Sequence, residues 1–85
     1  MDKKLTNKPW ITKRFEHTGM RRYYVASVQK NLFNQWEVFR CWGGINKATG
    51  SKIVMPCESY EDALNILTTI EKQRQQKKYQ LRIPQ

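Results

Sequence analysis

The sequence predicts an α+β fold, an antiparallel sheet of four to five strands with one long helix packed on one face. Residues 10–57 contain four runs in which apolar and polar side chains alternate, as they do in half-buried strands. Residues 59–77 instead repeat apolar side chains at helical spacing. Short turns join consecutive strands, and such connections favour antiparallel pairing.

Turn residues mark where each strand ends. The predicted strands are residues 10–17, 22–30, 36–42 and 51–57. Thr18-Gly19 separates the first two strands, and residues 31–34 separate the next two. Gly43-Gly44 ends the third strand, where glycine permits a positive φ and the close approach of another backbone or a ligand.

The helix signal is the clearest in the chain. Ser59 is placed as the N-cap and Asp62 as the third helical residue of a capping box. The C-terminal turns carry cations, which suit that end of the helix dipole: Lys72, Arg74, Lys77 and Lys78. Tyr79 and Leu81 then resume alternation and predict a short fifth strand at the sheet edge.

A single helix covers one face of a sheet, so alternation divides the strand residues between a covered face and an open face. We assign to the covered face Phe15, Tyr24, Ala26, Val28, Phe39, Cys41, Ile53, Met55 and Cys57. We assign to the open face Tyr23, Val25, Trp36, Val38, Arg40, Trp42, Lys52 and Val54. The open face is therefore expected to present aromatic and basic side chains together.

The charge balance restricts the partners. Sixteen Lys and Arg against seven Asp and Glu give a formal charge of +9 in 85 residues. Such a chain attracts nucleic acid, anionic membrane surfaces or acidic proteins. No apolar run approaches the roughly 18 residues of a membrane helix, and residues 1–4 do not resemble the start of a signal peptide. We expect a cytoplasmic monomer with a flexible basic lead-in at residues 1–9, one domain at residues 10–83 and no membrane association.

The reactive side chains are few. Cys41 and Cys57 are the only cysteines and His17 the only histidine, and a structural zinc site needs four such ligands. We predict buried, reduced thiols, no metal and no cofactor. The run from Lys47 to Lys52 lacks the glycine-lysine pattern of a phosphate loop, and no nucleophile lies in sequence near a base. We expect no enzymatic activity.

Several motifs together resemble a WGR domain over residues 10–81. They are Tyr23-Tyr24, Asn31-Leu32-Phe33, Val38-Phe39-Arg40, Trp42-Gly43, Glu61-Asp62-Ala63 and Lys77-Lys78-Tyr79. WGR domains occur in poly(ADP-ribose) polymerases, in a bacterial molybdate-metabolism regulator and as small stand-alone bacterial proteins. This chain resembles the small stand-alone bacterial type most. The resemblance implies an antiparallel sheet with one helix, and nucleic-acid binding. Trp42 matches the motif Trp that packs against a DNA end in the polymerases, whereas Gly44 stands where the family has Arg.

The residues support the same function independently, because aromatic rings stack on bases while cations hold phosphates. We expect a small basic nucleic-acid-binding module, with DNA favoured and strand ends or breaks among its targets. The candidate binding residues are Trp42, Arg40, Lys47, Lys52, Trp36, Tyr23, Lys77 and Lys78. The alternative is a protein-interaction module that uses the same face to bind an acidic partner or a second copy.

Overall fold

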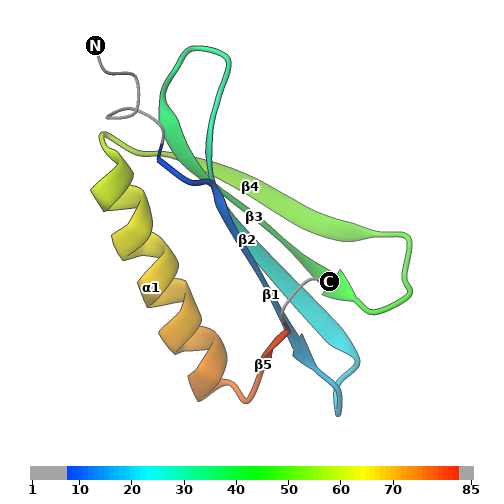
Figure 1. Cartoon of the computed structure of the whole chain (residues 1–85). Coiled ribbons are helices and arrows are strands. Elements are labelled where there is room, and N and C mark those ends of the chain that lie inside the picture. The colour runs from blue at the N-terminus through cyan, green and yellow to red at the C-terminus, as the bar shows by residue number, and fades with distance from the viewer. Residues whose placement is uncertain (1–7, 83–85) are drawn as a thin grey trace.

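The computed structural model describes residues 8–82 of the chain (Figure 1). Its elements follow in the order β1 (Ile11–His17), β2 (Arg22–Lys30), β3 (Trp36–Gly44), β4 (Gly50–Pro56), α1 (Tyr60–Gln76) and β5 (Gln80–Arg82). Residues 1–7 of the lead-in predicted at residues 1–9 lie outside the described residues. Residue 83, the last of the domain predicted at residues 10–83, also lies outside them.

The strands form a single five-stranded sheet in the order β4-β3-β2-β1-β5. Every neighbouring pair is antiparallel. The predicted fold class, α+β with an antiparallel sheet and one long helix, is therefore confirmed. The short strand β5 pairs with β1 only along Arg14, Phe15 and Glu16, as expected of a strand added at the edge.

The helix begins where the sequence predicts. Ser59 is the N-cap, and its side-chain oxygen accepts a hydrogen bond from the Asp62 backbone N–H at 3.1 Å. This bond satisfies one of the N–H groups that the first helical turn leaves without a partner. After the C-cap Lys77, Lys78 takes a positive φ of 71° and turns the chain toward β5.

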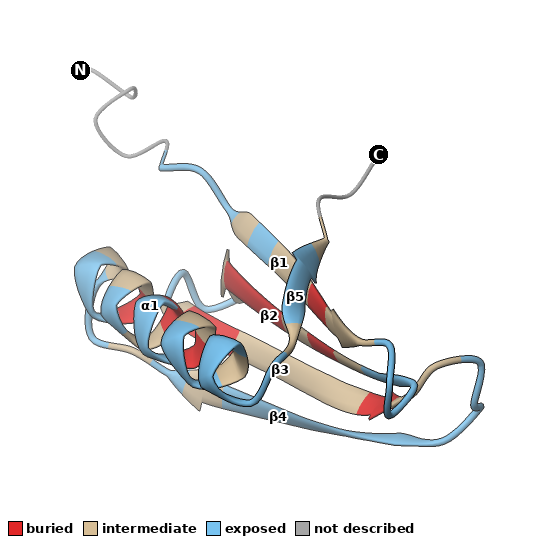
Figure 2. Ribbon diagram, turned by 90° about the horizontal axis from the view of Figure 1, so that it is seen from below, coloured by how far each residue is buried: buried red, intermediate tan, exposed pale blue. Residues whose placement is uncertain are grey.

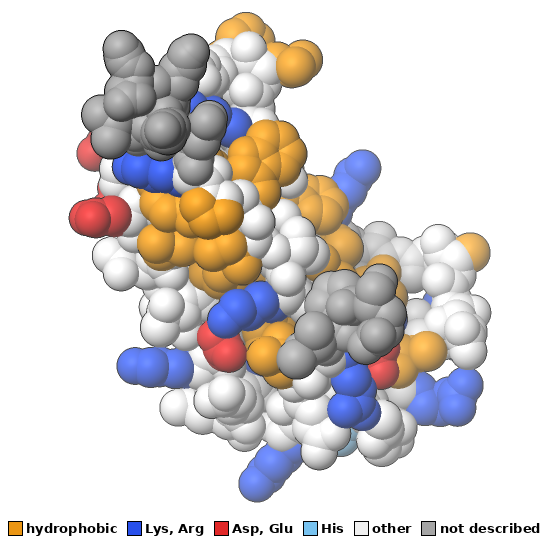
Figure 3. Space-filling model, viewed as in Figure 1, with side chains coloured by type: hydrophobic (Ala, Val, Ile, Leu, Met, Phe, Trp, Pro, Cys, Tyr) orange, Lys and Arg blue, Asp and Glu red, His pale blue; other side chains and the backbone are white. Residues whose placement is uncertain are grey.

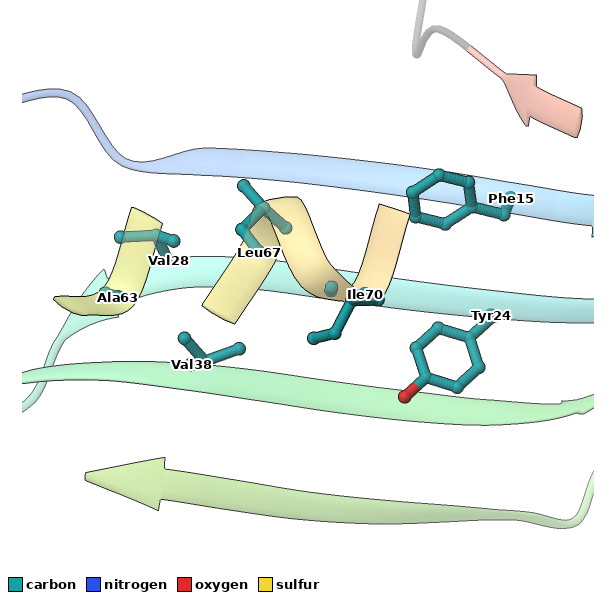
Figure 4. Packing of buried hydrophobic residues seen from close by; sticks show 8 residues of the cluster. Phe15, Tyr24, Val28, Val38, Ala63, Leu67 and Ile70 are labelled. Atoms are coloured by element: carbon teal, nitrogen blue, oxygen red, sulfur yellow. The ribbon is translucent and has the colours of Figure 1, made fainter. Parts of the chain in front are cut away.

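The core lies between α1 and one face of the sheet (Figures 2 and 4). The helix contributes Ala63, Leu67 and Ile70, which recur at the spacing that places them on one helical face. The strands contribute Phe15, Tyr24, Ala26, Val28 and Val38. Five of these eight residues are fully buried, which is a substantial apolar core for a chain of this length.

The faces predicted for β3 are wrong. The register pairs Tyr24 with Trp42, Ala26 with Arg40 and Val28 with Val38, and residues directly opposite each other project to the same face. Trp36, Val38, Arg40 and Trp42 therefore lie on the helix side, and Phe39 and Cys41 lie on the open side. Both alternating sets of β3 are apolar enough to enter a core, so alternation alone did not decide between them.

An arginine is accommodated on the helix side because its polar atoms have partners. Arg40 Nε donates to the Tyr24 hydroxyl at 2.7 Å, and an Arg40 terminal nitrogen contacts the Met55 sulfur at 3.2 Å. The hydrogen bond to a neighbouring hydroxyl lowers the cost of removing the guanidinium from water. The positions predicted for Tyr23, Val25, Lys52, Ile53, Val54 and Met55 agree with the register.

The two thiols are also less buried than predicted. Cys41 and Cys57 are free and only half-buried, because Cys41 faces the open side of the sheet and Cys57 follows β4 at its end. Partial burial raises the pKa of the Cys57 thiol, and the Asp62 carboxylate adds to the effect.

The glycine pair after Trp42 has a different role from the one predicted. Gly43 and Gly44 continue β3 and do not have a positive φ. The close approach is present: a Cβ on Gly43 would lie 3.1 Å from the Thr49 carbonyl oxygen and 3.3 Å from the Tyr23 ring. The glycine thus leaves room for the Tyr23 ring on the open face.

Candidate nucleic-acid interface

Two aromatic rings stack on the helix side of the sheet, near the C-terminal end of α1. Trp42 and its cross-strand partner Tyr24 lie nearly parallel, with centroids 5.6 Å apart and an angle of 11° between the rings. Tyr24 is buried, whereas Trp42 is only half-buried. The neighbour of Trp42 on β4 is the small, exposed Ser51, so the indole has a bulky partner on the Tyr24 side and a small one toward β4.

Two guanidinium groups lie against these rings. The Arg74 guanidinium is 4.3 Å from the Tyr24 ring centroid and 4.9 Å from that of Tyr79. The Arg40 guanidinium is 5.8 Å from both Tyr24 and Trp42. Cation–π contacts of this kind hold an arginine in place without neutralising it. We call Tyr24, Trp42, Tyr79, Arg40 and Arg74 the aromatic–arginine cluster.

The positive charge of this cluster is not compensated by carboxylates. The ion pairs within residues 8–82 join Lys13 to Glu71, and Arg14 and Arg82 to Glu16, so neither cluster arginine takes part in one. Nε of Arg74 is also buried without a hydrogen-bond acceptor among the described residues. Arginines placed together without acids repel each other and attract anions.

Exposed cations lie at the same end of the molecule as the cluster, in the β1–β2 turn, the β3–β4 loop and the end of α1. We call this surface the basic end; it consists of Arg21, Arg22, Lys47, Lys72, Lys77 and Lys78. The Ile45 backbone N–H donates to the Arg21 carbonyl at 2.8 Å and ties the β3–β4 loop to the β1–β2 turn. The edge contact of His17 with Tyr79, at 5.5 Å, brings the segment after α1 to the end of β1.

Three acidic residues lie at the opposite end of the molecule, whereas Glu16 and Glu71 lie toward the basic end and are paired with cations. Glu58, Glu61 and Asp62 lie around the start of α1, at the other end of the helix from the basic end (Figure 1). The space-filling view shows Lys and Arg side chains spread over its lower half, where α1 ends and the β1–β2 turn lies, and further ones in its upper half, where red acidic side chains accompany them (Figure 3). The molecule therefore has one strongly cationic end.

The structure brings together part of the predicted site. Trp42 and Arg40 are in contact, and Lys47, Lys77 and Lys78 belong to the basic end beside them. Trp36 lies at the opposite end of β3, roughly 20 Å away for six residues of a strand. There the ring centroids of Trp36 and Tyr60 are 4.7 Å apart, and Nζ of Lys30 lies 5.1 Å from the Trp36 ring centroid.

Tyr23 and Lys52 lie on the open face, on the other side of the sheet from Trp42. The Tyr23 ring carries the Arg14 guanidinium at 4.9 Å, and Arg14 is bonded to Glu16 at 2.8 Å. The Arg14 side-chain hydrogen bond is the main reason that the pKa of Glu16 lies below its usual value, and Arg82 adds to the effect. Tyr23 and Lys52 are therefore separate from the cluster, and Glu16 partly neutralises the Arg14 charge on the Tyr23 ring.

The candidate residues predicted from the sequence do not include Tyr24, Tyr79 or Arg74, although Arg74 is among the helix-end cations that could extend a track of phosphate contacts. These three residues come from β2, the segment before β5 and α1, so no spacing within one element connects them. The one available signal is local composition: residues 74–79 contain basic and aromatic side chains and no acidic ones.

A family comparison settles the fold family. The model of the WGR domain matches residues 8–85, nearly the whole chain. The chain belongs to the WGR domain family. WGR domains are nucleic-acid-binding modules and not catalytic domains. No curated protein and no solved structure matches the chain significantly.

In this WGR domain the third motif residue is Gly44, and the structure shows what surrounds it. A Cβ on Gly44 would lie 2.7 Å from Cγ of Lys47, so the lysine stem occupies the space beside the glycine. The cross-strand partner of Gly44 is Arg22. Two cations of the basic end therefore flank the position at which the motif has Arg.

No helix in residues 8–82 is long and apolar enough to cross a membrane. Within the same residues, no three His, Cys, Asp or Glu side chains are grouped as a metal site would require.

Proposed function

We propose that this WGR domain binds nucleic acid, with DNA as the favoured ligand, through the aromatic–arginine cluster and the basic end beside it. The observation that carries the proposal is the pair Arg40 and Arg74, held against Trp42 and Tyr24 without a carboxylate partner. An anionic ligand gives these arginines the negatively charged partner that the described chain does not supply.

Each part of the surface has a physical role in this proposal. The exposed lysines of the basic end contact phosphates, and each contact releases counterions from the nucleic acid. Trp42 offers a flat ring beside these cations, suited to stacking on a base or on a terminal base pair. Lys47 and Arg22 supply positive charge around Gly44. Together these groups match the phosphate-and-stack pattern of sequence-tolerant nucleic-acid binding.

The test compares two tryptophans of the same strand. Trp42→Leu removes the flat ring while retaining apolar packing for Tyr24, and Trp36→Leu is the matched control at the other end of β3. A titration with short blunt DNA, nicked DNA and single-stranded DNA should show a loss of about 1–3 kcal/mol for Trp42→Leu. Trp36→Leu should bind as the wild type does.

The salt dependence and the DNA topology make the test specific. Because Trp42 is uncharged, its replacement should leave the slope of log affinity against log salt unchanged. If the ring stacks on a terminal pair, the loss should be greater on linear duplexes than on closed circles. Equal affinity of the wild type and a folded Trp42→Leu variant for every DNA would contradict the role proposed for Trp42.

A further inference from the structure

The β2–β3 loop exposes two large apolar side chains at its tip. Leu32 is 100% exposed and Phe33 is 83% exposed. The loop projects beyond the start of α1 at the upper end of the molecule, and its hydrophobic side chains stand out in the space-filling view (Figures 1 and 3). Two adjacent large apolar side chains form an exposed patch at the loop tip, and contiguous patches of this kind mark interaction sites.

The loop is held in one conformation by its own hydrogen bonds. The Asn31 side-chain oxygen accepts from the backbone N–H of Phe33 at 2.8 Å and of Gln35 at 3.1 Å. The Asn31 backbone N–H donates to the Gln35 carbonyl at 2.9 Å, and the Asn31 carbonyl accepts from Asn34 at 3.0 Å. The two apolar side chains are thus presented on a preorganised support, which reduces the entropic cost of binding.

The same chain carries a groove of matching character. It has a volume of about 310 Å³ and runs between α1 and the strands β3 and β4, within the lower part of the range of pockets that take apolar ligands. Met55, Ile66 and Ile70 provide its apolar lining, Arg40 lies at its floor, and Asn65 and Thr69 form the helical rim. Neighbouring Ile53 is 46% exposed, so the helix leaves this side of the sheet partly uncovered.

The charges around the two features are complementary. Three acidic residues lie near the loop, Glu58, Glu61 and Asp62, because Tyr60 at the start of α1 packs on Trp36 at the base of the loop. Two amines lie there as well, those of Lys8 over the Tyr60 ring and Lys30 over the Trp36 ring. The groove has an arginine and no carboxylate among its lining residues. Carboxylates outnumber amines around the described part of the loop end, so this end of one molecule is complementary in charge to the arginine in the groove of another.

We propose that the chain self-associates head to tail, with Leu32 and Phe33 of one copy inserted into the α1–β3–β4 groove of a second copy. Because the loop and the groove are different surfaces, the contact is heterologous and leaves one free loop and one free groove in every dimer. The contact is small, so the association is weak. The net charge of +9 opposes it at low salt, and screening by salt favours it.

Sedimentation of the protein alone tests this arrangement at about 0.5 M salt and rising protein concentration, independently of any nucleic acid. The wild-type mass should increase with concentration. The loop variant Leu32→Ser/Phe33→Ser should remain monomeric, whereas Met20→Ser, which removes another exposed apolar side chain, should behave as the wild type. All variants are first checked for the wild-type circular dichroism spectrum and melting temperature.

A second variant blocks the groove. Thr69→Arg places a long side chain at the helical rim, and Thr68→Arg is its control, since it has the same charge change on an exposed neighbour outside the groove lining. Thr69→Arg should be monomeric, and Thr68→Arg should associate as the wild type does.

Mixing the two defective variants gives the decisive result. The loop variant retains its groove and Thr69→Arg retains its loop, so an equimolar mixture should form a dimer with one copy of each and nothing larger. A mixture that stays monomeric while the wild type associates would overturn the head-to-tail contact. A wild type that remains monomeric at every concentration would overturn self-association itself.

Discussion

At the scale of single residues, glycine is required where a ring and a backbone approach each other. A Cβ on Gly50 would lie 2.7 Å from the Trp42 carbonyl oxygen and 3.0 Å from the Tyr23 hydroxyl. The backbone oxygen belongs to the paired strand and has little freedom to move. At Gly44 the nearest atom is Cγ of the flexible Lys47 side chain, also at 2.7 Å. The same distance of 2.7 Å therefore predicts a larger loss of stability for an added Cβ at Gly50 than at Gly44.

We expect Gly50→Ala to lower the free energy of unfolding by about 1–3 kcal/mol, as overpacking does. Gly44→Ala should change it by less than about 0.5 kcal/mol, because the Lys47 side chain can rotate away. Urea titrations of the two variants provide the measurement. Equal losses at both positions would show that the rigidity of the contacted atom is not the deciding factor.

A second residue-scale prediction concerns Glu16, whose pKa is lowered by the hydrogen bond from Arg14 and by Arg82. A carboxyl whose pKa is depressed in the folded state stabilises the fold at pH values above its unfolded-state pKa, which is near 4.5. This stabilisation is lost as the pH falls through the folded-state pKa. Glu16→Gln should therefore lose less stability than the wild type on acidification. Parallel curves of melting temperature against pH for the two proteins would contradict this account.

At the scale of elements, strand and helix boundaries were predictable because particular residues punctuate the chain. Thr18-Gly19 and Asn31 lie in turns, and Ser59 caps α1 where the capping pattern places it. The faces of β3 were not predictable in the same way. Phe39 and Trp42 both suit a core, and only the pairing of Tyr24 with Trp42 fixes which set meets the helix.

The cap of α1 gives the element-scale prediction. Ser59→Ala removes the acceptor of the Asp62 N–H bond and should cost about 0.5–2 kcal/mol of unfolding free energy. Glu58→Ala, one exposed position earlier and outside the cap, serves as the control. A denaturant titration in which Ser59→Ala loses no more than Glu58→Ala would argue against the cap as a source of stability.

At the scale of the whole molecule, the fold separates two kinds of surface. The antiparallel hairpins and α1 place Arg21, Lys47 and Lys77 at one end, and the apolar loop with Leu32 lies at the other. The aromatic–arginine cluster could not be predicted from the sequence, because Tyr24, Trp42, Arg74 and Tyr79 come from four parts of the chain. Charge composition predicts an anionic partner but not its place on the surface.

The two proposals share one residue, Arg40, which belongs both to the aromatic–arginine cluster and to the lining of the groove. Nucleic acid neutralises the basic end and so removes much of the repulsion that a charge of +9 imposes between copies. We expect head-to-tail contacts to add cooperativity to DNA binding, and the loop variant Leu32→Ser/Phe33→Ser to bind with a shallower isotherm at equal salt. An isotherm of unchanged steepness would separate DNA binding from self-association.

The central claim, nucleic-acid binding at the basic end, is tested most directly by the salt dependence of DNA affinity in two matched double variants. Lys47→Gln/Lys77→Gln removes two charges from the basic end, and Lys8→Gln/Lys30→Gln removes two from the opposite end. Glutamine preserves the Cγ that packs beside Gly44.

On duplex DNA each lost phosphate contact lowers the log–log salt slope by about 0.9. We predict a decrease of about 1.8 for the basic-end pair and a slope like that of the wild type for the other pair. Equal slopes for the two variants would contradict the placement of the nucleic-acid interface at the basic end.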